Sequence, residues 1–564
     1  MDVEPIAKKT KLNEVLVKPW HLAVIFSCAF LFLMVTMNIM DTRMGNMVLF
    51  LYDEGLILFD SVRILSGDVP YRDFYTNYGP AQFYILAALF KLFGASVIIE
   101  RVWDLVIRSS TIVIIYLIII GAWGRKTALF TAIVVAFWLT SFGSYGYPVF
   151  PCLFFSLLSL YCTLPIFKER REIIFPLASG ACIGMVALFR YDVAVLAVVA
   201  GLFTLELFNL AQTKTHNKKK VLERSAIAYI CGILLVSVPV LFLLLSAVGF
   251  HDIWSNLVGL HISTYVHNRH LPLFSVDRIV HYTTDLGVYL PFLGLFSVVV
   301  VFSSGTKKLL TEAEDVRKLI LLRRWILVQL CAFSALFFVK GFVRASINHM
   351  ALSIVPALMI LCVTIKQRRQ TYYSKTSAFF IWFVFVCLII LFFPALRYAY
   401  IQFTQNAEWV LLDIHRKTGT GICSPPDGLE RMRCFPPAYN RVVAIRYIQQ
   451  RTKENDYIYV GTGRHDKILV NDILFYFASK RLSATKWHQF DPGITNTKDI
   501  QSEIISDLCK HHPRYVILTS LWDNWHEGNA SDYSSGVHLL DDFLRTNYRL
   551  VAVFGDLQIG ELIN

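Results

Sequence analysis

The sequence predicts a polytopic α-helical membrane protein with about 11 transmembrane helices and a C-terminal extracytoplasmic α/β domain. Of its 564 residues, 55% are hydrophobic and only 17% are charged, whereas soluble domains carry about 25% charged residues. Apolar runs recur from Trp20 to Leu396, and the residues after Leu396 have the mixed composition of a soluble domain. A soluble multidomain enzyme is therefore excluded.

A helix needs about 20 mostly apolar residues to cross the hydrocarbon core of a membrane. Eleven segments approach that length, and they lie at residues 20–40, 101–121, 127–142, 148–166, 173–189, 193–210, 226–247, 286–303, 322–339, 349–365 and 377–396. The first has no small-residue cleavage site after it, so we expect a retained anchor. The segments divide the chain into a membrane domain, residues 1–396, and a soluble domain, residues 397–564.

The basic residues indicate the orientation, because Lys and Arg concentrate in cytoplasmic loops. If the N-terminus is cytoplasmic, the inner segments hold 24 Lys and Arg and the outer segments hold nine. We therefore expect a cytoplasmic N-terminus and an extracytoplasmic C-terminal domain. Much of the net charge of +13 then reflects topology, and nucleic-acid binding loses its support.

The first outer loop, residues 41–100, is acidic, with seven carboxylates against four basic residues, and it holds two short amphipathic stretches expected at the membrane interface. Asp53 and Glu54 directly follow apolar residues, where an ionised group is costly and therefore suggests function. A carboxylate at such a boundary can have a raised pKa and accept a proton from a hydroxyl. Tyr71 and Tyr78 are candidates for stacking on a sugar, and Asp73 is a further substrate-binding candidate. The alternative for acids in this loop is simple solvation.

Several short motifs together resemble the GT-C superfamily of membrane glycosyltransferases, and within it the protein O-mannosyltransferase and aminoarabinose transferase (ArnT-like) group. They are Asp53-Glu54, Gly67-x-x-Pro70-Tyr71-Arg72-Asp73, Tyr78-Gly79-Pro80, Leu92-Phe93-Gly94 and Arg101 at the second span. Tyr78-Gly79-Pro80 replaces the Lys-Pro-Pro usual in aminoarabinose transferases, so the donor and acceptor classes do not transfer. The resemblance implies inverting transfer of a sugar from a polyprenyl-phosphate donor to an acceptor on the extracytoplasmic face. It also implies that Asp53 is the base and that Glu54 supports it.

Such a reaction needs a cation near the departing phosphate, where negative charge develops. Arginine suits phosphate because its guanidinium forms paired hydrogen bonds. The candidates at the outer ends of spans are Arg101, Arg190 and Arg344, the last together with His349. Arg190 could instead pair with Asp192, and His349 could be a capping or core residue. Lys340 is a further outer cation, for which snorkelling to the interface is the commoner role.

No cofactor is indicated. The second outer loop, residues 248–284, is rich in histidine, but His251, His261 and His267 do not have the spacing of a closed metal site. We expect this loop to cover the cavity, and we assign no metal ligands, although some members of the superfamily depend on a divalent metal.

Strand-like runs at 457–461, 514–518 and 550–554 alternate in the C-terminal domain with helical patterns at 439–452, 468–480, 498–511 and 536–546, as in a small sheet covered by helices. Cys423 and Cys434 could form a disulfide on the oxidising side. We expect this domain to recognise the acceptor or to cap the cavity.

Two other functions remain alternatives: a transporter or flippase of lipid-linked sugars, and a membrane oligosaccharide polymerase or ligase. The expected partners are a polyprenyl-phosphate sugar donor, membrane lipids, and a lipid, glycan or protein acceptor. The compact basic loops favour a bacterial inner membrane.

Overall fold

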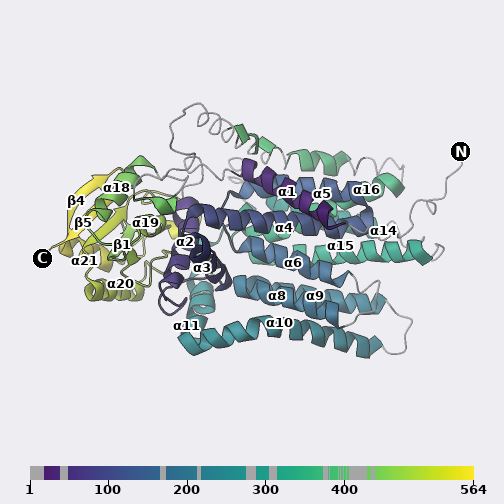
Figure 1. Cartoon of the computed structure of the whole chain (residues 1–564), viewed down its shortest axis with the longest axis horizontal. Coiled ribbons are helices and arrows are strands. Elements are labelled where there is room, and N and C mark those ends of the chain that lie inside the picture. The colour runs from purple at the N-terminus through teal and green to yellow at the C-terminus, as the bar shows by residue number, and fades with distance from the viewer. Residues whose placement is uncertain are drawn as a thin grey trace.

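The computed structural model describes residues 18–37, 49–164, 173–211, 218–274, 287–303, 314–371, 428–432 and 438–563, with scattered residues between 379 and 404. Long helices lie side by side in a bundle, and a domain with a β-sheet covers one end of it (Figure 1). The two long outer loops lie at this same end, so the segments predicted to be extracytoplasmic are brought together.

The first ten predicted spans each overlap one helix of the bundle. These helices are α1 (Pro19–Thr36), α4 (Val97–Trp123), α5 (Arg125–Leu139), α6 (Val149–Thr163), α8 (Ile174–Phe189), α9 (Tyr191–Ala211), α10 (Lys218–Val248), α14 (Leu290–Ser303), α15 (Glu314–Gly341) and α16 (Ile347–Thr371). Six described helices are long and apolar enough to cross a membrane, and others are apolar but shorter. Of the eleventh predicted span, 377–396, the structure describes residues 379, 382–390, 393 and 396, and all of these are helical. The protein is a multi-pass membrane protein.

Small residues allow α8 and α10 to approach closely. A Cβ atom at Gly180 would collide with the carbonyl oxygen of Tyr229, and one at Gly232 would collide with that of Leu177. Lipid is as apolar as the side chains, so close van der Waals packing of this kind stabilises helix pairs in a membrane.

The first outer loop forms a π-helical turn, η2 (Leu49–Glu54), followed by α2 (Gly55–Leu65) and α3 (Ala81–Phe93). Every residue from Gly55 to Arg63 is buried, because α2 lies between the bundle and the sheet domain (Figure 1). By contrast, Leu92 and Phe93 at the end of α3 are exposed. Of the two stretches expected at the membrane interface, α2 is thus enclosed by protein, whereas α3 presents apolar side chains outward.

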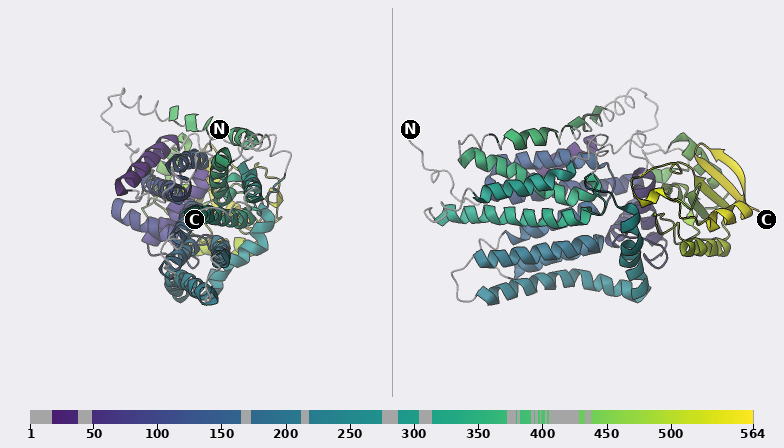
Figure 2. Two further views of the ribbon diagram at one scale, coloured as in Figure 1. Left: turned by 90° about the vertical axis from the view of Figure 1, so that its right-hand side faces the viewer. Right: turned by 180° about the vertical axis from the view of Figure 1, so that it is seen from behind.

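The second outer loop is largely helical where it is described. It contains α11 (Phe250–Trp254), η4 (Ser255–Gly259), η5 (His261–Tyr265) and α12 (Val266–Arg269), and it crosses the end of the bundle beside the sheet domain (Figure 2). Leu271 then bridges to Arg344, with its N–H donating to the Val343 carbonyl at 3.1 Å. This bridge ties the loop to the connection between α15 and α16.

The C-terminal domain contains a five-stranded sheet in the order β2-β1-β3-β5-β4. Strands β1 (Tyr457–Thr462), β2 (Leu482–Ser483) and β3 (Tyr515–Thr519) are parallel, and β4 (Tyr548–Phe554) and β5 (Leu557–Leu562) form an antiparallel hairpin beside β3. The helices of the domain are α18 (Tyr439–Gln449), α19 (Leu474–Ser479), α20 (Lys498–His511) and α21 (Leu539–Asn547). The predicted α/β domain is confirmed, with β2 and β5 added. Cys423 and Cys434 are not among the described residues, and the domain boundary at residue 396 stays a prediction.

Buried polar contacts join the sheet domain to the first outer loop. His488 contacts Asp60 at 2.6 Å with both side chains fully buried, and the Phe59 and Tyr476 rings stack at 4.8 Å. The Tyr75 N–H donates to the Lys486 carbonyl at 3.0 Å. A buried carboxylate is costly unless it is hydrogen-bonded, so these contacts fix the position of the domain over the bundle.

Candidate active site

The π-helical turn η2 holds both predicted catalytic acids at the junction of the two domains. Single π turns are rare and often occur at functional sites, because they redirect side chains that a regular helix would align. Gly55 follows the two acids, and a Cβ there would lie 2.5 Å from the backbone nitrogen of Leu474. Only glycine lets α19 of the sheet domain pack this closely against the turn.

Glu54 is engaged in a buried ion pair. Its two carboxylate oxygens accept hydrogen bonds from Arg101 at 2.6 and 2.9 Å, and both side chains are nearly inaccessible. The Glu54 carboxylate therefore holds the guanidinium of Arg101, which was predicted to bind phosphate. The geometry makes Arg101 and Glu54 a structural support for the turn that presents Asp53.

Asp53 differs from its neighbour because its side chain has no hydrogen bond within the described part of the chain. It retains some accessible surface although protein surrounds it. Burial raises the pKa of Asp53 from 3.8 to about 7, opposed by the positive charges of Arg269 and Arg344 and assisted by the negative charge of Asp491. A carboxyl group with a pKa near neutrality is matched to proton transfer at physiological pH.

The sheet domain contributes Asp491 to the surroundings of Asp53. The Tyr52 hydroxyl donates to the Phe490 carbonyl at 2.8 Å and lies 3.1 Å from an Asp491 oxygen, and the Gln489 amide donates to the other Asp491 oxygen at 2.9 Å. Burial raises the pKa of Asp491, opposed by Arg269. Sequence reasoning did not find this residue, since only the docking of the two domains brings it near Asp53.

Two arginines of the membrane domain meet a carboxylate of the sheet domain. Arg344 donates to both oxygens of Glu527 at 2.6 and 3.0 Å, and Arg269 donates to one of them at 3.1 Å. All three side chains are mostly buried. The arginines hold the pKa of Glu527 down to about 2 against the effect of burial, so Glu527 is ionised at neutral pH.

The remaining outer cations form a group next to Arg344. Arg190 makes a paired hydrogen bond with Asp192 at 2.8 and 3.0 Å, the alternative considered for it above. The His349 ring contacts the Ser346 hydroxyl at 2.8 Å. The ammonium nitrogen of Lys340 is buried and has no hydrogen-bond partner in the part of the chain that the structure describes, so it does not snorkel to water.

These basic residues belong to one site, which we call the basic wall and which consists of Lys340, Arg190, Arg344, Arg269 and His349. The charges of the other four members all act on His349. Tyr78 and Tyr147, whose ring centroids are 6.2 Å apart, interact electrostatically with both Asp53 and Arg190. The two tyrosines thus link the acid turn to the basic wall.

The other first-loop residues proposed to bind substrate have these contacts. The buried Tyr71 hydroxyl donates to the Tyr78 carbonyl at 2.8 Å. Asp73 accepts from the Val69 N–H at 2.7 Å and from Arg72 at 2.8 Å, which closes the turn. Tyr78 lies beneath Arg190, whose guanidinium carbon is 5.5 Å from the ring centroid. Of the three, Tyr78 is the one placed beside the basic wall.

Gly79 explains how Tyr78 reaches Arg190. Its N–H donates to the Phe189 carbonyl at 3.0 Å, and a Cβ would collide with the carbonyl oxygen of Leu188. The glycine therefore allows the first loop to contact the end of α8 directly, which is a physical reason for the Tyr78-Gly79-Pro80 motif.

A possible metal-binding group lies elsewhere. Asp466, His538 and Asp541 of the sheet domain have ligand atoms within 4.8 Å of one another, but Asp466 is paired with Arg464 at 2.5 Å and Asp541 with His465 at 2.7 Å. Carboxylates already bound to a guanidinium and an imidazole are poor candidates for a metal ion.

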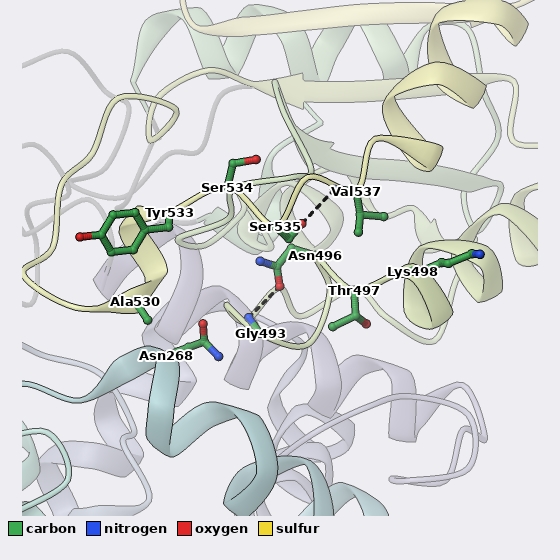
Figure 3. A pocket seen from close by; sticks show the side chains of 10 residues that line it. All are labelled: Asn268, Gly493, Asn496, Thr497, Lys498, Ala530, Tyr533, Ser534, Ser535 and Val537. Atoms are coloured by element: carbon green, nitrogen blue, oxygen red, sulfur yellow. Dashed lines mark hydrogen bonds between the residues drawn. The ribbon is translucent and has the colours of Figure 1, made fainter.

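Two depressions flank the contact between the second outer loop and the sheet domain. The first, of about 450 Å³, is lined by Asn268, Gly493, Asn496, Thr497, Lys498, Ala530, Tyr533, Ser534, Ser535 and Val537 (Figure 3). The second, of about 500 Å³, is lined by Ile262, Val266, His267, His270, Gly528, Asn529 and Ala530. The loop that carries Glu527 lies between them.

Comparison with known proteins agrees with this architecture. Residues 77–243 match the family model of dolichyl-phosphate-mannose-protein mannosyltransferases, and no curated protein sequence matches significantly. The chain is similar to ArnT from Cupriavidus metallidurans solved in the apo state, with a TM-score of 0.55 and 13% identity over 96% of this chain and 97% of that chain. It is similar to the same protein bound to undecaprenyl phosphate, with a TM-score of 0.53 and 14% identity over 96% of this chain and 97% of that chain. It is also similar to the oligosaccharyltransferase AglB from Archaeoglobus fulgidus in complex with an inhibitory peptide and a dolichol-phosphate. The TM-score is 0.50 and the identity 12%, over 96% of this chain and 74% of that chain. The predicted resemblance is confirmed: the chain has the fold of the GT-C membrane glycosyltransferases.

Proposed function

We propose that the protein is an inverting glycosyltransferase that moves a sugar from a polyprenyl-phosphate donor to a hydroxyl acceptor on the extracytoplasmic face of the membrane. The observation that carries the proposal is the state of Asp53. Its accessible carboxylate has no hydrogen-bond partner among the described residues, its pKa is raised to about 7, and the charges of Arg269 and Arg344 in the basic wall act on it. Neighbours of this fold are bound to undecaprenyl phosphate or dolichol-phosphate, which supports a lipid-linked donor.

In the proposed step, Asp53 accepts the proton of the acceptor hydroxyl as the acceptor oxygen attacks the anomeric carbon. The bond between that carbon and the phosphate oxygen breaks, and its electron pair leaves with the phosphate. Attack opposite to the leaving group inverts the anomeric configuration. The basic wall stabilises the negative charge that develops on the phosphate.

We assign the departing phosphate first to Lys340 and His349. Lys340 has a buried Nζ without a hydrogen-bond partner among the described residues, and a buried polar group without a partner is costly unless a ligand compensates it. Arg190 keeps Asp192 as a partner and borders the site, and Arg344 joins it when free of Glu527. We do not assign Arg101, because Glu54 occupies its guanidinium.

The sheet domain has two proposed roles. It completes the site with Asp491 and Glu527, and the two depressions at its contact with the second outer loop receive the acceptor. We further propose that the donor sugar is a hexose or pentose, that the N-terminus is cytoplasmic and that the membrane is a bacterial inner membrane. The carboxylate of Asp53 opposite a basic wall favours group transfer over transport, since transport alone needs no general base.

The test uses purified protein with undecaprenyl-phosphate-linked sugars, and an envelope extract supplies the acceptors. A glycosyltransferase will release undecaprenyl phosphate only when acceptor is present. A flippase will move the lipid across a vesicle membrane and leave the sugar–phosphate bond intact. An intact donor after translocation would refute the proposed function.

A further inference from the structure

Glu527 lies where an anionic ligand would be expected. Its carboxylate binds the Arg344 guanidinium through two hydrogen bonds and Arg269 through a third. A phosphate group engages arginine with the same paired geometry and the same charge sign. Both arginines act electrostatically on Asp53, so the anion that occupies them lies close to the proposed base.

The attachment of Glu527 differs from that of the other carboxylates in the site. Asp192 is two residues from Arg190, so this pair forms within one short segment. Glu527 instead comes from the sheet domain, in an irregular stretch between β3 and the short helix η8 (Ala530–Asp532). Within that stretch Asn529 donates to Glu527 at 2.9 Å. Movement of this loop alone would free both arginines without moving α12, which carries Arg269, or the connection between α15 and α16, which carries Arg344.

The surroundings leave room for such a movement. The residues after Glu527 line both depressions, with Ala530 shared between them, and Figure 3 shows Ala530 beside Asn268 in the first. Tyr533 is 75% exposed, so its side chain does not hold the loop against the domain. Arg269 also has a buried Nε without a hydrogen-bond partner among the described residues, which leaves a donor for an incoming oxygen.

We propose that Glu527 is an internal anion that occupies Arg344 and Arg269 in the empty enzyme and is replaced by the phosphate of the polyprenyl donor. The affinity for the lipid then depends on competition between the two anions, and return of Glu527 to the arginines assists release of the polyprenyl phosphate product. This inference rests on the proposed function.

The test measures binding of undecaprenyl phosphate to the purified full-length protein in detergent. Glu527→Gln keeps the shape of the side chain and removes its charge, so the competitor is weakened and the affinity should rise by about tenfold, as expected for loss of one charge-assisted hydrogen-bonded pair. Glu527→Asp keeps the charge and should remain near wild type. Asp532→Asn is the matched control, because Asp532 lies in the same loop but pairs with Lys467 and His526.

A purely structural role predicts the opposite sign, since loosening the loop would weaken or leave unchanged the binding of the lipid. A Glu527→Gln protein that binds undecaprenyl phosphate no more tightly than wild type would overturn the inference. Hydrogen exchange gives a second readout: the lipid should increase deuterium uptake in residues 521–530 of the wild type, and failure to do so would also overturn it. If wild type binds no undecaprenyl phosphate at all, the proposed function fails instead. Inorganic phosphate, tested in parallel, shows whether the lipid chain is needed.

Discussion

The pH dependence of transfer should move in opposite directions when the two charges flanking Asp53 are removed. The rise in the pKa of Asp53 from 3.8 to about 7 corresponds to about 4 kcal/mol of destabilisation of the carboxylate. Because a base must be ionised, kcat/KM should fall tenfold per pH unit below about pH 7 and level off above it. The Asp491 charge raises this pKa and the Arg269 charge lowers it.

Asp491→Asn should therefore shift the acid limb of the profile to lower pH, and Arg269→Gln should shift it to higher pH, each by about one pH unit, as expected for a nearby charge in a partly buried site. The assay is kcat/KM against pH with a polyprenyl-phosphate-linked sugar as donor. Arg464→Gln, which removes an arginine of the sheet domain paired with Asp466, is the control and should leave the limb in place. The electrostatic account of Asp53 would be refuted if Asp491→Asn and Arg269→Gln shifted the acid limb in the same direction. It would also be refuted if neither variant shifted the limb.

Three further predictions concern the supports of the site. Glu54→Gln removes the negative charge that pairs with the buried Arg101 guanidinium and should destabilise the protein by about 3–5 kcal/mol. The measurement is the melting temperature in detergent, which should fall, and an unchanged value would argue against the support role of the pair. Gly55→Ala places a methyl group 2.5 Å from the Leu474 nitrogen and should expose the sheet domain to limited proteolysis; equal protection in both proteins would contradict the packing argument. Lys340→Met should raise KM for the donor about tenfold, as expected for loss of a charge-assisted hydrogen bond. Lys340→Arg should recover part of this loss. An unaltered KM for the donor would show that Lys340 does not bind the phosphate.

The sequence predicted the bundle well because the membrane imposes a length and a composition on every span. Trp20 to Leu396 contains the apolar runs that become the helices, and the acid turn at Asp53 followed from the cost of placing charge next to apolar residues. The β4–β5 hairpin was only half predicted: Leu557 and Ile559 are buried on alternate positions of β5, but the tight turn at Gly555, with φ of 64°, was not used as a hairpin signal.

The composition of the site was harder to predict, because it depends on contacts between distant segments. Charge and location along a span made Arg101, Arg190 and Arg344 all candidates, with Arg344 preferred and Asp192 a possible partner of Arg190. Only the folded chain shows that Glu54 pairs with Arg101 and Glu527 with Arg344. Glu527 is 183 residues from Arg344 in sequence. No local pattern could have joined them.

The most direct test of the central claim is sugar transfer by Asp53→Asn protein. With undecaprenyl-phosphate-linked sugar and acceptor, the variant should bind the lipid as wild type does, because the basic wall is intact, and should lose transfer by a factor of about 10² to 10⁴, the usual contribution of a general base. Asp252→Asn, which alters an exposed acid of the second outer loop next to the exposed His251, should transfer at the wild-type rate. Wild-type transfer by the Asp53→Asn protein would contradict the assignment of Asp53 as the base.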